Sequence, residues 1–126
     1  MVFGIGIDII EIERIKESVD KFGDKFLNRV FTEVELDYCM SRANRYQHLA
    51  ARFAAKEAVA KALSSGWQST FNWKDIEVYN EPSGMPSVKL SGTLLEFLGS
   101  DKELKLTMSH SHHYVTCFAI VYAKNL

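Results

Sequence analysis

The 126-residue sequence has few cysteines, no long apolar run and almost no net charge. Its 2 cysteines, Cys39 and Cys117, form no CxxC pair, so we expect two reduced, buried thiols of a cytoplasmic protein, with a lone catalytic cysteine as the alternative. No stretch approaches the roughly 18 consecutive apolar residues of a transmembrane helix. The formal net charge of -1 provides no global basic field, so we expect neither a nucleic-acid nor a membrane partner.

The composition is that of an ordinary globular protein, with 47% hydrophobic and 25% charged residues. The length suits one domain over residues 1–126, and neither an internal repeat nor a low-complexity tract divides it. The first ten residues are apolar but include Asp8 and no basic leader, so we expect no signal peptide.

The pattern of apolar residues predicts strands at both ends of the chain and helices after the first strand. Thr32 and Glu35 have the spacing of a capping box at the start of one helix. We expect a strand over 1–10, helical residues 11–30 with a break at Gly23, a helix after residue 32, a long helix over 45–63, strands over 76–79 and 87–90, a short helix over 93–98, and strands over 104–108 and 115–122. This order predicts an α+β fold with an antiparallel sheet packed on the long helix.

Asp8 is the single charged residue among the first ten. In a strand it shares a face with Gly4 and Gly6, because side chains alternate between the two faces. Two glycines beside an acid leave room for a helix or a ligand to approach the backbone closely. The alternative is that Asp8 caps the following helix.

Glu57 is a carboxylate on the long helix whose neighbours at helical spacing are mostly small and apolar. That stripe should face the core or another chain, where an unpaired carboxylate is costly unless it binds a metal. The alternative is a surface pair between Glu57 and Lys61. Together with Asp8, Glu57 suggests a Mg²⁺ site shared with substrate phosphates, and we expect Arg52 and Lys56 to meet phosphates from the other side of the helix.

Four segments resemble, in order, the signatures of the holo-[acyl-carrier-protein] synthases, which are small phosphopantetheinyl transferases. The third, RFAAKEAVAKAL, is the most specific of them. The segments are residues 4–15, residues 31–36, residues 52–63, and Ser109-His110 with the strand that follows. Because they span nearly the whole chain, we expect the phosphopantetheinyl transferase fold.

The resemblance implies an activity and a role for each site residue. The activity is Mg²⁺-dependent transfer of 4′-phosphopantetheine from coenzyme A to a serine of an apo acyl carrier protein in fatty acid biosynthesis, with release of adenosine 3′,5′-bisphosphate. Asp8 and Glu57 would bind the metal, and Glu57 could also accept the serine proton. Lys61 would contact the diphosphate and assist the leaving group, while Arg52 and His110 would hold the 3′-phosphate. The resemblance also implies a homotrimer with active sites between subunits.

The segment over residues 11–30 has an apolar face and two charged flanks. Six residues are expected to face the core: Ile12, Ile15, Val19, Phe22, Phe26 and Val30. The resemblance implies that this helix binds the acidic carrier protein, although a solvated helix of mixed charge is the alternative. The basic flank consists of Arg14, Lys21, Lys25 and Arg29.

Two other functions fit parts of the pattern. A hotdog-type acyl-CoA thioesterase would also wrap a sheet around a long helix, but it leaves the pairing of Asp8 with Glu57 unexplained. A non-catalytic module that binds carrier protein or nucleotide would not be expected to retain both acids and Lys61. Two sites depart from the family pattern. They are Ser64-Ser65-Gly66 after the long helix, and Met85 in the turn between the predicted strands over 76–79 and 87–90.

Overall fold

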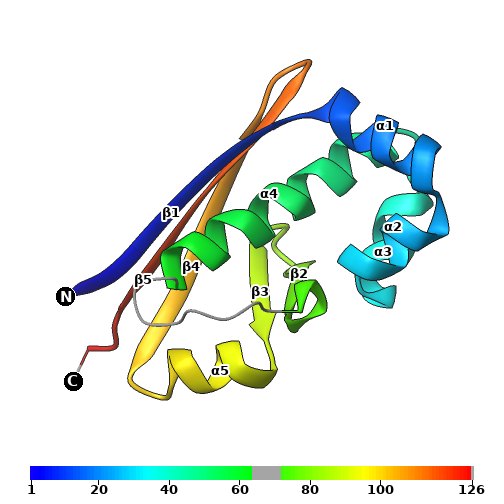
Figure 1. The fold of residues 1–126 in the computed structure, drawn as a ribbon. Helices are drawn as coiled ribbons and strands as arrows, with labels where there is room; N and C mark the ends of the chain where they lie inside the picture. The colour runs from blue at the N-terminus through cyan, green and yellow to red at the C-terminus, as the bar shows by residue number, and fades with distance from the viewer. Residues whose placement is uncertain (64–71, 126) are drawn as a thin grey trace.

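The computed structural model describes residues 1–63 and 72–125 and divides the strands between two antiparallel sheets (Figure 1). The larger sheet has the strand order β1-β5-β4, in which the N-terminal strand pairs with the C-terminal one. The smaller sheet is the hairpin of β2 and β3. The strands are β1 (Val2–Glu11), β2 (Ile76–Asn80), β3 (Pro86–Leu90), β4 (Lys102–His110) and β5 (Tyr114–Ala123). All of the predicted strands are therefore confirmed.

The helices follow the predicted order. Gly23 separates the first two with a φ of 57°, a left-handed conformation that favours glycine. Thr32 and Glu35 form the predicted capping box. No described helix is both long enough and apolar enough to span a bilayer. The helices are α1 (Ile12–Phe22), α2 (Asp24–Val30), α3 (Glu33–Met40), α4 (Arg45–Leu63), the 3-10 turn η1 (Trp73–Asp75) and α5 (Gly92–Leu98).

The long helix α4 packs directly on the larger sheet (Figure 1). The close contact is possible because two glycines of β1 leave no side chain between the two backbones. A Cβ atom on Gly4 would lie 1.9 Å from the carbonyl oxygen of Ala62, and one on Gly6 would lie 2.0 Å from that of Ala58. The close approach expected at these glycines is thus made by a helix. The α+β fold with an antiparallel sheet on the long helix is confirmed.

The larger sheet has one buried and one exposed face. The side chains of β5 that point toward α4, such as Val115 and Cys117, are buried. On the opposite face of β1, Ile5 is 61%, Ile7 61% and Ile9 65% exposed. Within one chain, this second face therefore remains an apolar surface.

The expected core face of residues 11–30 is partly wrong. Ile15 and Val30 are buried, but Phe22 is 54% exposed, and Leu27, which was not expected, is buried. The physical reason lies at Gly23, where the left-handed backbone ends α1 and starts α2 in a new direction. The two helices therefore do not share one continuous apolar stripe.

Both thiols are free and buried, as expected. Burial raises the pKa of Cys39 to about 11 and that of Cys117 to about 12. A thiol with so high a pKa carries almost no thiolate near neutral pH, so neither cysteine is suited to act as a nucleophile.

Candidate active site

Asp8 and Lys61 meet where β1 crosses the C-terminal half of α4. Asp8 lies opposite Cys117 of β5, so its side chain points to the α4 side of the sheet. The Lys61 ammonium donates to the carbonyl oxygen of Ile7 at 2.9 Å and to Oδ1 of Asp8 at 3.4 Å. The side chains of Lys61 and Asp8 are 54% and 19% exposed, so this ion pair is open to solvent and to a ligand.

Glu57 belongs to the same cluster. Burial raises the pKa of Glu57, the negative charge of Asp8 raises it further, and the positive charge of Lys61 opposes both effects. Glu57 and Lys61 follow Phe53 along the part of α4 that is not fully buried. Glu57 therefore does not face the core of its own chain. Asp8, Glu57 and Lys61 are brought together within a single chain.

A second cluster surrounds Arg52, which is only 3% exposed. Its Nη2 donates to Oδ1 of Asn80 at 2.8 Å, and its guanidinium carbon lies 4.3 Å from the centre of the Tyr38 ring. Its Nε is buried and has no hydrogen-bond partner among the described residues. A buried donor without a partner is costly, so a ligand oxygen would be favoured at this position.

Arg52 lines a cavity of about 350 Å³ together with His110 at the end of β4. The structure thus brings these two predicted residues to one cavity. His48, one helical turn before Arg52, also lines it. Sequence reasoning missed Tyr38, His48 and Asn80; the i,i+4 spacing of His48 and Arg52 was the one available signal. The polar and charged lining is Tyr38, Gln47, His48, Arg52, Asn80, Thr107, Ser109 and His110.

The charge around this cavity is mainly positive. Burial lowers the pKa of His48, and the nearby positive charges of Arg52 and Arg42 and the His110 imidazole lower it further. The guanidinium carbon of Arg42 lies 3.8 Å from the centre of the Tyr38 ring. Arg52 in the cavity wall and Arg42 beside Tyr38 place positive charge next to the cavity, so the cavity is suited to a phosphate group.

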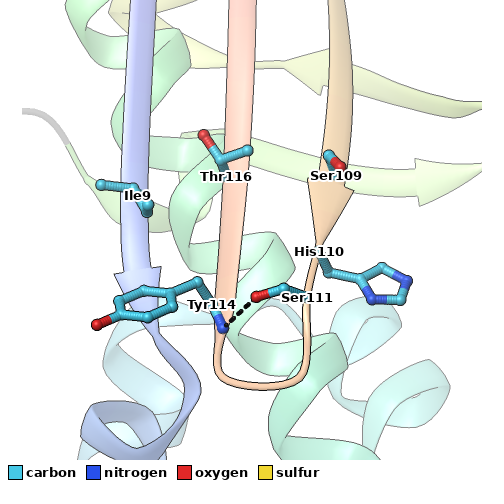
Figure 2. A pocket seen from close by; sticks show the side chains of 6 residues that line it. All are labelled: Ile9, Ser109, His110, Ser111, Tyr114 and Thr116. Carbon is cyan, nitrogen blue, oxygen red and sulfur yellow. Dashed lines mark hydrogen bonds between the residues drawn. The ribbon is translucent and has the colours of Figure 1, made fainter.

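His110 also lines a neighbouring cavity at the turn between β4 and β5, which measures about 280 Å³ (Figure 2). The backbone N–H of Tyr114 donates to Oγ of Ser111 at 3.3 Å across this turn. Figure 2 shows Ile9, Thr116 and Ser109 on the three strands above it. His110 therefore stands between this outer cavity and the cavity of Arg52.

Lys56 does not face phosphates, and that expectation was wrong. Its side chain is completely buried, and its Nζ lies 2.8 Å from Oε1 of Glu35. The side of α4 that carries Lys56 is covered, because β2 and α3 pack against it. Met85 is 58% exposed and does not line the cavity of Arg52, whereas Ser64–Gly66 lie outside the described residues.

The four basic residues expected to bind carrier protein are all exposed. Lys25 and Arg29 line a cavity of about 320 Å³ together with Phe22 and Phe26. The ammonium of Lys21 lies 5.3 Å from the centre of the Phe22 ring. Arg14, in the first half of α1, does not line this cavity.

Comparison with protein families matches residues 4–121 to the 4′-phosphopantetheinyl transferase superfamily. A holo-[acyl-carrier-protein] synthase of Protochlamydia amoebophila is 50% identical over 120 residues, which cover 95% of this chain and 98% of the relative. One from Koribacter versatilis is 41% identical over 124 residues, covering 96% and 98%.

Solved structures agree with the sequence relatives. The holo-[acyl-carrier-protein] synthase of Neisseria meningitidis superposes with a TM-score of 0.86 at 31% identity, covering 97% of this chain and 99% of that one. The enzyme of Helicobacter pylori, solved in complex with coenzyme A, gives a TM-score of 0.79 at 31% identity and covers 94% and 99%.

Proposed function

Because the chain belongs to the 4′-phosphopantetheinyl transferase superfamily, we propose that it transfers 4′-phosphopantetheine from coenzyme A to a serine of an apo acyl carrier protein. Adenosine 3′,5′-bisphosphate is the leaving group. The observation that carries this proposal is the agreement of relatives and solved structures over nearly the whole chain. They favour the transferase over the thioesterase and the non-catalytic module. We propose that residues 1–126 act as one domain, in the cytoplasm and in fatty acid biosynthesis.

The cavity of Arg52 is proposed to hold the nucleotide end of coenzyme A. The buried Arg52 Nε, which has no partner among the described residues, is available to a 3′-phosphate oxygen. His110 would approach the same phosphate from the end of β4. The Helicobacter pylori relative was solved with coenzyme A, which supports coenzyme A as the substrate.

Asp8 and Glu57 are proposed to hold Mg²⁺ together with the diphosphate. The donor set fits this ion, since Mg²⁺ favours one or two carboxylates with water and substrate phosphates over an all-protein cage. The two carboxylates are close enough for the charge of Asp8 to raise the pKa of Glu57, and a cation between them would relieve that repulsion. When bound, the ion would supply positive charge to the phosphoryl oxygens.

The remaining chemistry follows from Glu57 and Lys61. The serine oxygen attacks the β-phosphorus, the bond from that phosphorus to the bridging oxygen of the diphosphate breaks, and the serine proton passes to Glu57 directly or through water. Burial and the charge of Asp8 raise the pKa of Glu57 in the metal-free protein, and a bound cation would oppose that rise. Lys61, positioned by Ile7 and Asp8, would balance the charge that develops on the leaving phosphate.

We propose a homotrimer whose subunits cover the exposed face of the larger sheet. That face carries Ile5, Ile7 and Ile9, each more than half exposed, with Phe118 opposite Ile7 on β5. Contiguous apolar surface of this kind is typical of an interface. Light scattering in solution would measure the mass of the assembly, and a mass of one chain would contradict the proposal.

The acyl carrier protein is proposed to dock on α1 and α2. Exposed Arg14 and Lys21 lie on α1, and Lys25 and Arg29 flank an aromatic cavity on α2. Basic side chains around an apolar pocket suit an acidic helix that presents one apolar residue.

The transfer is tested by mass spectrometry of an apo carrier protein incubated with this protein, coenzyme A and Mg²⁺. We expect the carrier to gain the mass of one phosphopantetheine. A Glu57→Gln variant serves as the matched control, and addition of a chelator tests the metal. Transfer at the full rate in excess chelator would overturn the Mg²⁺ assignment, and no transfer by the parent protein would overturn the function.

A further inference from the structure

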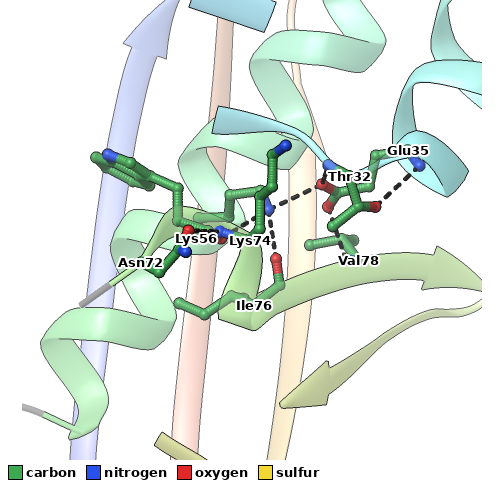
Figure 3. Close-up of polar contacts among 8 residues, drawn as sticks. Thr32, Glu35, Lys56, Asn72, Lys74, Ile76 and Val78 are labelled. Atoms are coloured by element: carbon green, nitrogen blue, oxygen red, sulfur yellow. Dashed lines mark hydrogen bonds and ion pairs between the residues drawn. The ribbon is translucent and has the colours of Figure 1, made fainter. Parts of the chain in front are cut away.

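Lys56 is a fully buried ammonium next to Glu57 in the sequence. Its side chain is 0% exposed, as is that of its partner Glu35, and the two are 2.8 Å apart (Figure 3). Lys56 also donates to the carbonyl oxygen of Trp73 at 3.1 Å and to that of Ile76. An ammonium has three protons, so these three acceptors satisfy it completely and leave none for substrate.

Glu35 is satisfied in the same way. Its Oε1 accepts from the backbone N–H of Thr32 at 2.9 Å, which completes the capping box of α3. Its Oε2 accepts from the backbone N–H of Val78 in β2 at 2.8 Å. A capping box requires only the first of these bonds. The pair of Glu35 and Lys56 therefore ties four elements together: α3, α4, η1 and β2.

The contacts on β2 lead directly to the nucleotide cavity. Ile76 and Val78 are bound by the pair, and Asn80 follows at the end of the same strand. The side chain of Asn80 accepts from Arg52, which lies one turn before Lys56 on α4. The strand is thus fixed to α4 at two points, once by a buried ion pair and once at the wall of the cavity.

We propose that Glu35 and Lys56 are positioning residues for coenzyme A. They fix β2 relative to α4, and this places the Asn80 amide where it orients the Arg52 guanidinium toward the 3′-phosphate. A fully satisfied buried network is rigid, and a buried ion pair contributes more to defining geometry than to net stability. The inference rests on the proposed function, because it assigns the pair to the substrate of that reaction.

The test requires a protein that lacks the pair but still folds. The double variant Glu35→Leu with Lys56→Met replaces both charges by apolar groups of similar length, a change that buried pairs often tolerate. It removes the bonds to the backbone groups of Thr32, Trp73, Ile76 and Val78 together. We expect a lower melting temperature than that of the parent, because these backbone groups lose their partners, and at a temperature where the variant is folded we expect KM for coenzyme A to rise about tenfold. We expect kcat and KM for carrier protein to change less than about twofold.

Asn80→Ala provides a second and milder variant, because Asn80 is exposed and does not contribute to the core. We expect it to raise KM for coenzyme A by a similar factor. If both variants act through Arg52, combining Asn80→Ala with the double variant should add little to KM. If the pair does not act through Arg52, the increases in KM for coenzyme A from Asn80→Ala and from the double variant should be additive.

Calorimetric binding of adenosine 3′,5′-bisphosphate separates this inference from the proposed function. The measurement needs no turnover, and we expect Kd to rise with KM in each variant. Failure of the parent protein to modify carrier would refute the activity, whereas unchanged KM and Kd in the folded double variant would overturn the positioning role. If the double variant does not fold, unchanged nucleotide binding in Asn80→Ala overturns it instead.

Discussion

Two lysines of α4 form ion pairs of the same chemical type in opposite surroundings. Lys56 and Glu35 are both 0% exposed and 2.8 Å apart. Backbone groups form hydrogen bonds with the other two ammonium protons and with the second carboxylate oxygen. Lys61 and Asp8 are 54% and 19% exposed and 3.4 Å apart. The saturated pair has no capacity for a ligand, whereas the open pair can exchange a solvent contact for a phosphate. Burial and saturation, more than residue type, therefore separate a structural ion pair from a candidate catalytic one.

The largest effect should come from the open cluster. Glu57→Gln keeps the size of the side chain but removes the base and a metal ligand, so we expect kcat to fall by about 10²–10⁴. Asp8→Asn should act similarly, and the two together should be little worse than either alone. Rates of carrier modification measure this, with thermal unfolding as the control for folding. If Glu57→Gln modifies carrier protein at the parental rate, the open cluster of Asp8, Glu57 and Lys61 is not catalytic.

The matched pair Lys56→Met and Lys61→Met tests the comparison directly. Lys56→Met leaves the Glu35 carboxylate buried without its partner, and we expect a loss of about 3–5 kcal/mol in the free energy of unfolding. Lys61→Met removes an exposed pair, which contributes about 0–1 kcal/mol. Denaturant unfolding measures both. Equal destabilisation by the two changes would contradict the different roles of the buried and the exposed ion pair.

Charge reversal on α2 should have a smaller effect, confined to one substrate. Lys25→Glu is expected to raise KM for carrier protein about threefold to tenfold and to leave KM for coenzyme A unchanged, because Lys25 does not line the cavity of Arg52. Arg14→Glu should act in the same direction. Lys89→Glu, at an exposed position of β3, is the control. Added salt should reduce the difference in KM for carrier protein between parent and variant. If neither charge reversal changes KM for carrier protein, the basic flank is a solvated surface that does not bind the carrier.

The smallest effect concerns pH and the cavity of Arg52. The pKa of His48 is lowered by burial and by its neighbours Arg52, Arg42 and His110, with Tyr38 packed against its ring. The unfolded chain then binds more protons than the folded one, so His48 costs stability as pH falls below its ordinary value of 6.5.

Thermal unfolding between pH 8 and pH 5, at about half-unit steps, measures this effect. We expect His48→Gln to lose less stability than the parent as pH falls. Adenosine 3′,5′-bisphosphate should narrow that difference, because a bound anion favours the protonated imidazole. Parallel curves for the two proteins would show that His48 does not titrate in this range.

Local patterns predicted the order of elements well. The capping box of Thr32 and Glu35, the break at Gly23 and the bounds of α4 all follow from short-range rules. The core face of α1 and α2 was predicted only in part: Ile15 and Val30 are buried, but periodicity assumes one straight helix and Phe22 lies at the bend.

The sequence alone determined the α+β class, the glycines that admit α4, and the residue types suited to phosphate chemistry. Tertiary structure decided which of those residues are available. On a helical wheel Lys56 and Arg52 are equivalent, and only the packing of α3 and β2 on α4 shows that one is saturated while the other keeps a donor for a ligand. It also decided that Tyr38, His48 and Asn80, from three separate elements, share one cavity. Such contacts join residues far apart in the chain, and no local rule encodes them.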